Sequence, residues 1–222
     1  MKKKISLIVA LAVLTVGSYA QETTSNWSAS ADIVSSYVWR GLYLSNSSIQ
    51  PTVTFSTNGF SIGGWGSAGV DGYLEADLFA KYQFNFGLWL GLTDYYFPSI
   101  ENGNDYFDAS EETGSHAFEI NGGYGISGFN IAANYVINKA GGAGSQGSDV
   151  YFEADYTYKN FRIFVGGGDG WHSVSGNFNI SNIGVGITKN IPISTTFSFP
   201  LKGSVILNPN TQKFYVVAGI TL

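Results

Sequence analysis

The sequence predicts an all-β fold, a closed antiparallel transmembrane β-barrel of about twelve strands. Three observations support this prediction: an unusual composition, an apolar–polar alternation with a period of two, and short turns that alternate with longer loops. Charged residues make up 12% of the chain and aromatic residues 16%. Soluble domains carry roughly 25% charged residues. A chain with few charges and many rings is expected to turn an apolar surface outward.

Residues 1–20 are expected to be a signal peptide, and residues 21–222 the barrel domain. A cationic start, a short apolar run and a small-x-small cleavage site follow one another in Lys2 to Lys4, Ile5 to Val16 and Ser18 to Ala20. That layout is typical of a signal peptide, and the apolar run is too short to span a bilayer. We therefore expect export, with the outer membrane of a Gram-negative bacterium as the destination of a β-barrel.

The composition excludes several classes of function. Without the three leader lysines, the chain has eight of its 11 basic residues left against 16 acidic residues. This acidic balance argues against a nucleic-acid partner. The absence of cysteine excludes disulfides, cysteine zinc sites and a lipid-modified N-terminal cysteine. No segment after residue 20 has eighteen consecutive apolar residues, which excludes membrane helices and leaves a closed barrel as the backbone solution in lipid. No cofactor is expected, since the glycines at 166–168 precede no predicted helix.

The alternation of apolar and polar residues is clear in three segments, "YLEADLFAKYQF" (73–84), "FNIAANYVIN" (129–138) and "VYFEADYTY" (150–158). In the first, Leu74, Ala76 and Leu78 share one face while Glu75 and Asp77 share the other. Alternation of this kind is typical of strands with one apolar face. The predicted strands are 27–40, 49–57, 60–68, 73–84, 87–97, 116–124, 128–138, 149–158, 161–169, 176–188, 195–207 and 211–222.

Short and long connections alternate along the chain. The short ones are Asn58-Gly59, Asn85-Phe86, 125–127, Lys159-Asn160 and 190–192; the longer ones are 41–48, 69–72, 98–115, 139–148 and 170–175, with 208–210 short where length is expected. Outer-membrane barrels place tight turns in the periplasm and long loops outside. An even strand count then places both termini in the periplasm, and "KFYVVAGITL" at the C-terminus resembles the signal that the outer-membrane assembly machinery reads.

Three segments leave the strand count or phase open. "GLWLGLTDYYF" (87–97) can be phased with either its leucines or Trp89 and Tyr95 outward, and the phase changes between Ile180 and Ile183, which predicts a bulge. Pro200 lies inside a predicted strand, although a closed barrel has no edge strand to receive it. Ten or fourteen strands therefore stand as alternatives to twelve.

The first predicted strand, 27–40, carries Trp27 and Trp39 on its outward face. Their spacing separates the two rings by about 30 Å along the membrane normal, which places one at each interface. Arg40 points into the lumen in this reading, and 41–48 is an extracellular loop. The expected aromatic belt consists of Trp27, Tyr37, Trp39, Tyr135, Tyr156 and Tyr158.

The segments "SSYVWRGLYLSNSSIQPTVTFSTNGFSIGGWGS", "LEADLFAKYQF" and "DYYFP" resemble the TorF-type porin family, bacterial proteins long catalogued without a known function. Its elements are matched here by Tyr37, Arg40, Gly41, Gln50, Trp65, Gly66, Glu75, Asp77, Tyr95, Tyr96 and Pro98. The resemblance covers about the first half of the mature chain. It implies an outer-membrane barrel surrounded by outer-membrane lipid.

Residues of both charge signs are predicted to line the lumen. By parity these are Asp32, Arg40, Glu75, Asp77, Lys81, Glu119, Glu153, Asp155, Arg162 and Lys202. This lining predicts a passive channel for small polar solutes, with a salt-bridged, plugged lumen as the alternative.

Two further classes are weighed against the channel. A lipid-acting enzyme would need a nucleophile beside His116 or His172, and no spacing links either histidine to one, so neither a catalytic nor a metal site is assigned. The acidic loop 101–114 lacks EF-hand spacing and is expected to be a solvated surface loop rather than a calcium site. A receptor or adhesin that uses loops 98–115 and 139–148 stays open as an alternative.

Overall fold

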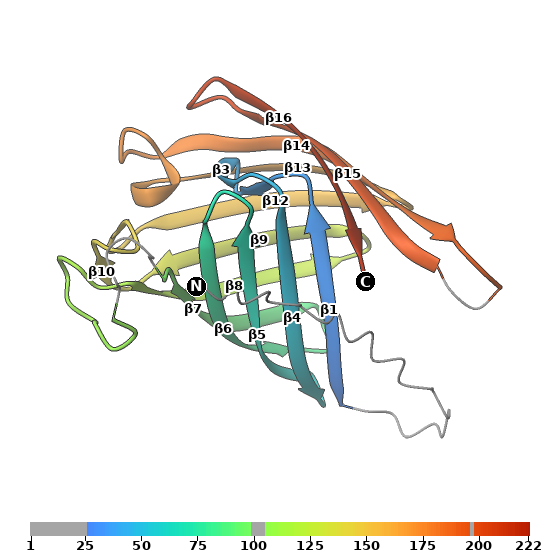
Figure 1. The fold of residues 1–222 in the computed structure, drawn as a ribbon, viewed down its shortest axis with the longest axis horizontal. Helices are drawn as coiled ribbons and strands as arrows, with labels where there is room; N and C mark the ends of the chain where they lie inside the picture. The colour runs from blue at the N-terminus through green and yellow to red at the C-terminus, as the bar shows by residue number, and fades with distance from the viewer. Residues whose placement is uncertain (1–25, 99–104, 196–197) are drawn as a thin grey trace, which may run out of the picture.

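The structure is a computed structural model that describes residues 26–98, 105–195 and 198–222. The predicted signal peptide, 1–20, lies outside the described residues. The chain forms one closed antiparallel barrel of twelve strands (Figure 1). The predicted fold class and strand number are thereby confirmed, and the alternatives of ten or fourteen strands are wrong.

The wall strands follow one another around the barrel in chain order, and the last pairs with the first. They are β1 (Trp27–Val34), β4 (Ser48–Thr57), β5 (Phe60–Gly69), β6 (Leu74–Gln83), β7 (Leu88–Tyr96), β8 (His116–Ile126), β9 (Phe129–Val136), β12 (Val150–Tyr158), β13 (Phe161–Gly168), β14 (Asn179–Pro192), β15 (Ser198–Asn208) and β16 (Lys213–Thr221). The shorter elements are β2 (Tyr37–Trp39), β3 (Leu42–Ser45), β10 (Lys139–Ala140), β11 (Ser145–Gln146) and the 3₁₀ turn η1 (Gly170–His172).

The two ends of the barrel differ in the length of their connections. At one end, here called the turn end, strands are joined by tight turns such as Asn58-Gly59, where both residues have positive φ (48° and 84°). A two-residue turn of this kind matches the twist of the flanking strands. The opposite end, here called the loop end, carries the connections that contain β10, β11 and η1. Two predicted turns shift: 125–127 becomes Ser127-Gly128, and 190–192 belongs to β14.

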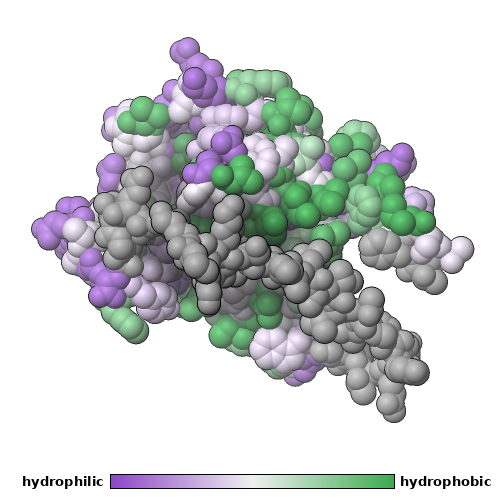
Figure 2. Space-filling model, viewed as in Figure 1, coloured by the Kyte–Doolittle hydropathy of each residue, from purple (hydrophilic) through white to green (hydrophobic). Residues whose placement is uncertain are grey.

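The outward face of the wall is apolar. Leu78 and Phe152 keep 56% and 50% of their surface exposed, and large apolar side chains are exposed in the same way on most wall strands. Hydrophilic residues gather at the loop end, on the left of Figure 2, and hydrophobic residues lie over the strands toward the turn end. The apolar residues therefore coat the outside, as the period of two predicted.

Within the described ranges, no helix has the length and apolar character needed to cross a membrane.

The first predicted strand, 27–40, is wrong beyond Val34. Val34 pairs with Ser48 and ends the β1–β4 ladder, and β2 and β3 form a hairpin between the two strands that folds into the barrel. Tyr37 is only 9% exposed. Neither Tyr37 nor Trp39 therefore belongs to an aromatic belt, and the predicted loop 41–48 contains the strand β3 instead. The parity argument failed because a hairpin that alternates in the same way continues the pattern of the wall.

The three ambiguous segments are resolved by the register of the ladders. On β7 the leucines face outward, and Tyr95 is buried inside. The predicted bulge lies at Ser181, which the β13–β14 pairing skips between Ile180 and Asn182. Pro200 pairs with Asn190 in the β14–β15 ladder but lies one residue beyond the β15–β16 ladder, which begins at Leu201, so it interrupts no bond on the β16 side.

Candidate functional site

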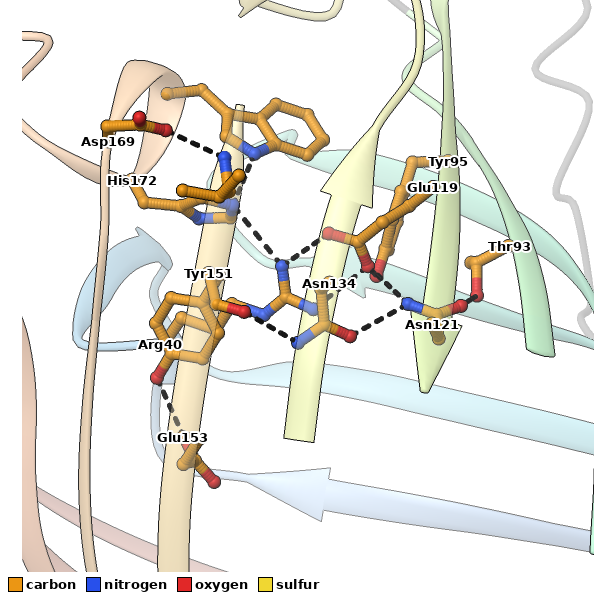
Figure 3. Close-up of polar contacts among 12 residues, drawn as sticks. Arg40, Thr93, Tyr95, Glu119, Asn121, Asn134, Tyr151, Glu153, Asp169 and His172 are labelled. Carbon is orange, nitrogen blue, oxygen red and sulfur yellow. Dashed lines mark hydrogen bonds and ion pairs between the residues drawn. The ribbon is translucent and has the colours of Figure 1, made fainter. Parts of the chain in front are cut away.

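The hairpin β2–β3 presents Arg40 at its tip. Trp39 pairs with Leu42, so Arg40 and Gly41 form a two-residue turn with φ values of 51° and 81°. Positive φ at both positions matches the turn type that suits a twisted hairpin. The turn pushes the guanidinium away from the hairpin and across the lumen (Figure 3).

Arg40 makes a bidentate ion pair with Glu119 on β8. Its Nη1 and Nη2 atoms donate to Oε1 and Oε2 of Glu119 at 2.6 and 2.9 Å. The guanidinium also lies between the rings of Trp39 and Tyr151, 4.4 and 4.5 Å from their centroids. A planar cation held by a fork of hydrogen bonds and two aromatic faces is among the better-defined contacts that a protein can make.

Glu119 is fully buried, and further donors satisfy it. The Tyr95 hydroxyl and the Asn121 amide both donate to Oε2, at 2.9 and 2.6 Å. The Asn121 amide nitrogen also donates to Asn134 Oδ1, and the Thr93 hydroxyl donates to Asn121 Oδ1. The carboxylate thus receives four donors, so its charge can stay buried without a large penalty.

His172, from η1, covers the Arg40 guanidinium from the loop end. The Trp171 indole donates to His172 Nε2 at 2.7 Å, and Arg40 Nη1 lies 3.3 Å from the same atom. Burial, and secondarily the Arg40 cation, lower the pKa of His172 to about 2, so the ring is neutral. His172 is therefore a buried acceptor, and its Nε2 is already occupied by the Trp171 and Arg40 donors.

The backbone of the hairpin tip is bound to the far wall. Ser181 Oγ donates to the Arg40 carbonyl at 3.1 Å, and Asn208 Nδ2 donates to the Gly41 carbonyl at 2.9 Å. A Cβ on Gly41 would lie 1.8 Å from the Ser181 carbonyl oxygen, so only glycine fits here. We call this set of contacts the Arg40 anchor: Arg40, Gly41, Glu119, Tyr151, His172, Ser181 and Asn208.

A cavity of about 890 Å³ runs from the Arg40 anchor to the turn end. Trp39, Arg40 and Tyr151 line it at the hairpin, and Lys159 and Asn190 line it near the turns. The lumen on this side is thus a vestibule whose loop end is occupied by the hairpin tip.

The other predicted lumen residues also lie inside the barrel, and most are paired. Lys202 binds Asp32 at 3.0 Å across the closing seam. Arg162 binds Glu153 and Asp155 at 2.6 and 3.1 Å. The Lys81 ammonium lies over the Trp89 ring near the turn end. Glu75 and Asp77, on β6, are not among the residues that line the vestibule and lie beside Tyr37.

His116 lies on the outward face near the loop end. Its Nδ1 contacts the Asp94 carboxylate at 2.8 Å, and its Nε2 contacts the Tyr106 carbonyl at 2.6 Å. Both ring nitrogens are therefore occupied by acceptors, which leaves neither free to activate a nucleophile.

Sequence parity missed the neutral members of the site. The residues that face inward include Tyr95, Asn121, Asn134 and Tyr151. They could have been found from the sequence, because they alternate with the outward leucine, isoleucine and phenylalanine residues of the same strands. Of the expected aromatic belt, Trp27, Tyr135, Tyr156 and Tyr158 are exposed on the outside.

Comparison with known proteins gives two similarities. Two engineered variants of the Rhodopseudomonas blastica porin are similar to 79% of this chain at 12% sequence identity, with TM-scores of 0.42 and 0.40. The match covers 55% of each porin chain, so this chain spans little more than half of their length. No curated protein sequence matches it. Over residues 20–199 the sequence matches the family described as bacterial protein of unknown function (Gcw_chp), and the chain belongs to this family.

Proposed function

We propose that this chain is an outer-membrane channel of the TorF type for small polar solutes, and that the Arg40 anchor closes it at the loop end. The anchor is the observation on which the second half of the proposal depends. A buried bidentate pair, two cation–π contacts and two backbone hydrogen bonds hold the hairpin tip in the lumen.

Residence in the outer membrane is supported by the distribution of apolar surface. A water-soluble barrel would bury its large apolar side chains, whereas Leu78, Phe152 and Ile163 are each at least half exposed on the outer wall. Closed barrels leave no unpaired strand edge for lipid to contact. We infer that outer-membrane lipid covers this surface and that the outer-membrane assembly machinery inserts the barrel, guided by the alternation in β16.

The class of solute follows from the lining of the vestibule. Its described charges are compensated locally apart from Lys159 at the turn end, since Arg162 faces Glu153 and Asp155 while Lys202 faces Asp32. Neutral polar groups such as Asn182 and Thr157 fill much of the remaining lining. A lining in which most charges are paired favours small polar solutes over ions of one sign.

A variant without the hairpin tests this proposal. Because Val34 and Ser48 are cross-strand partners, residues 35–47 can be replaced by Asn-Gly, a two-residue turn that preserves the register of β1 and β4. We call this protein the hairpin-replaced variant. In liposome-swelling assays it should admit small sugars and amino acids with rates that fall as solute size rises, and the wild-type protein should be slower.

Each other outcome has a clear meaning. If both folded proteins leave liposomes as impermeable as empty ones, the channel proposal is wrong and the barrel is a plugged structural or surface protein. If the wild type is as permeable as the variant, the barrel is a channel but the Arg40 anchor does not close it.

A further inference from the structure

A second buried cluster lies against β5 and β6, beside Tyr37 of the hairpin. Glu75 and Asp77 point inward from β6, two residues apart on the same face, and are only 5% and 7% exposed. Neighbouring positions of this kind on a strand lie about 7 Å apart. The two carboxylates therefore share one small region enclosed by the wall and by Tyr37 of the hairpin.

Neither of these carboxyl groups has a cationic partner among the described residues. The ion pairs formed by those residues use Glu119, Asp94, Glu153, Asp155 and Asp32 as their acids. Burying an ionised carboxylate without a counter-charge costs several kcal/mol, roughly, even after local relaxation. Ionised together, Glu75 and Asp77 would therefore need a counter-charge that no described side chain supplies.

Phenol groups satisfy Glu75 only in part. The Tyr73 hydroxyl donates to Glu75 Oε2 at 2.7 Å, and Tyr37 also hydrogen-bonds this carboxylate. A phenol can donate a hydrogen bond but carries no positive charge, so neither ring neutralises the carboxylate.

Two oxygen atoms in the cluster have no partner. Asp77 Oδ1 and Ser67 Oγ are buried and accept or donate no hydrogen bond within the described protein. Ser67, 4% exposed, lies directly opposite Glu75 in the β5–β6 ladder, and opposed residues project from the same face of a sheet. Buried polar atoms are almost always paired, so two orphans beside an unbalanced acid pair indicate a missing ligand.

A third side chain can contribute an oxygen. Gln50 on β4 lies between the pairs Ile49–Ala68 and Thr52–Trp65, beside Ser67. Its Nε2 donates to Ser48 Oγ at 3.1 Å, which leaves the carbonyl oxygen of the amide free to turn toward the cluster. All available donors are thus oxygens, with no sulfur and no imidazole among them.

We propose that Glu75, Asp77 and Ser67, with Gln50 beside them, form a binding site for a hard divalent cation, Ca²⁺. Two carboxylates balance the charge of one divalent ion. Carboxylate, hydroxyl and amide oxygens are the ligands that Ca²⁺ takes, and Ca²⁺ tolerates the irregular geometry of side chains from three strands. The proposal stands independently of the proposed channel, because binding is measured without conductance.

Terbium luminescence tests the site in the refolded full-length barrel. Tb³⁺ occupies calcium sites, and the rings of Tyr37, Tyr73 and Trp65 beside the acids would sensitise its emission. The wild type should give a saturable signal that Ca²⁺ displaces, and Ca²⁺ should raise the unfolding temperature. Asp77→Asn should weaken Tb³⁺ binding by at least about tenfold, since ligand charge sets the affinity of such sites.

Matched variants control for other acids and for folding. Asp155→Asn removes a luminal carboxylate that already pairs with Arg162, and it should leave the Tb³⁺ signal unchanged. Ser67→Ala preserves the charge and should weaken binding by less than Asp77→Asn. The proposal is overturned if the wild type gives no Ca²⁺-displaceable signal, if Asp77→Asn binds as the wild type does, or if Asp105→Asn with Asp108→Asn abolishes the signal. If the wild type gives no Tb³⁺ signal and Asp77→Asn does not change its stability, the proposal is wrong and Asp77 carries a proton instead.

Discussion

The tip of the luminal hairpin and its Tyr37 end meet buried charge in different ways. At the tip Arg40 faces Glu119, and the pair is completed by Tyr95, Asn121 and two aromatic faces. Near Tyr37, Glu75 accepts from phenols and Asp77 from a backbone amide, and two oxygen atoms have no partner among the described residues. Contacts between described residues complete the Arg40–Glu119 pair, whereas those described around Glu75 and Asp77 leave the second cluster incomplete.

The Arg40 contacts therefore act as an anchor, whereas the cluster around Glu75 and Asp77 has the features of a binding site. A fully hydrogen-bonded ion pair fixes one conformation, because removing either partner leaves the other charge buried and unpaired. An unsatisfied pair costs free energy in the folded state unless a ligand or a proton is present. The effect of changes at Glu75 or Asp77 should therefore depend on added cation, whereas the effect of changes at the Arg40 anchor should not.

The largest effect is expected from breaking the anchor. Arg40→Met leaves Glu119 buried without its cation and should lower the free energy of unfolding by about 3–5 kcal/mol. Arg40→Met combined with Glu119→Gln removes both charges and should recover much of that loss. Urea-induced unfolding in detergent is measured for four proteins, the wild type, the two single variants and the double variant, and simple additivity of the two single changes would contradict the coupling.

A smaller effect is expected at the hairpin tip. Gly41→Ala adds a Cβ 1.8 Å from the Ser181 carbonyl oxygen at a φ of 81°. Gly72→Ala is the matched control, since Gly72 has a φ of 92° but nothing within 4 Å of the added atom. Backbone strain should cost about 1–2 kcal/mol in both variants, and overpacking about 1–3 kcal/mol more at Gly41 alone. Equal unfolding free energies for the two variants would show that the tip is not held against β14.

The smallest effect, taken per pH unit, is a pH dependence from His172. Its pKa falls from 6.5 to about 2 on folding, so below pH 6.5 the unfolded chain takes up a proton that the folded chain does not. Stability should therefore be lost as the pH falls below 6.5, by about 1.4 kcal/mol per pH unit from this residue. His172→Gln retains a neutral acceptor for Trp171 and Arg40 and should flatten the profile between pH 6.5 and 4. Parallel profiles for wild type and variant would contradict the neutral, buried ring.

The wall of the barrel was predictable from the sequence, and the reason is local. On β6, β9 and β12 every second residue is apolar because one face meets a uniform apolar surrounding, so Leu78 and Phe152 could be assigned without knowing their neighbours. The same parity predicted that Glu119, Glu153 and Arg162 face inward, but not which charges pair.

The hairpin was not predictable, because its placement depends on partners far along the chain. Arg40 and Glu119 lie 79 positions apart, and Arg40 and Ser181 lie 141 apart. Trp39 is a residue type that occurs both at membrane interfaces and in packed interiors. Tyr37 and Trp39 continue the alternation of β1, so the pattern does not break before the chain reverses at Arg40-Gly41. Both residues of that turn have positive φ, but Arg-Gly is not a common sequence signal for such a turn.

Single-channel conductance in planar bilayers tests most directly whether the hairpin tip closes the lumen at the loop end. The wild type, the double variant of Arg40→Met with Glu119→Gln, and the hairpin-replaced variant are recorded under the same salt and voltage. We predict long closed intervals for the wild type, more frequent openings for the double variant, and a steady open level for the hairpin-replaced variant. A wild type that is open as steadily as the hairpin-replaced variant would contradict closure by the Arg40 anchor.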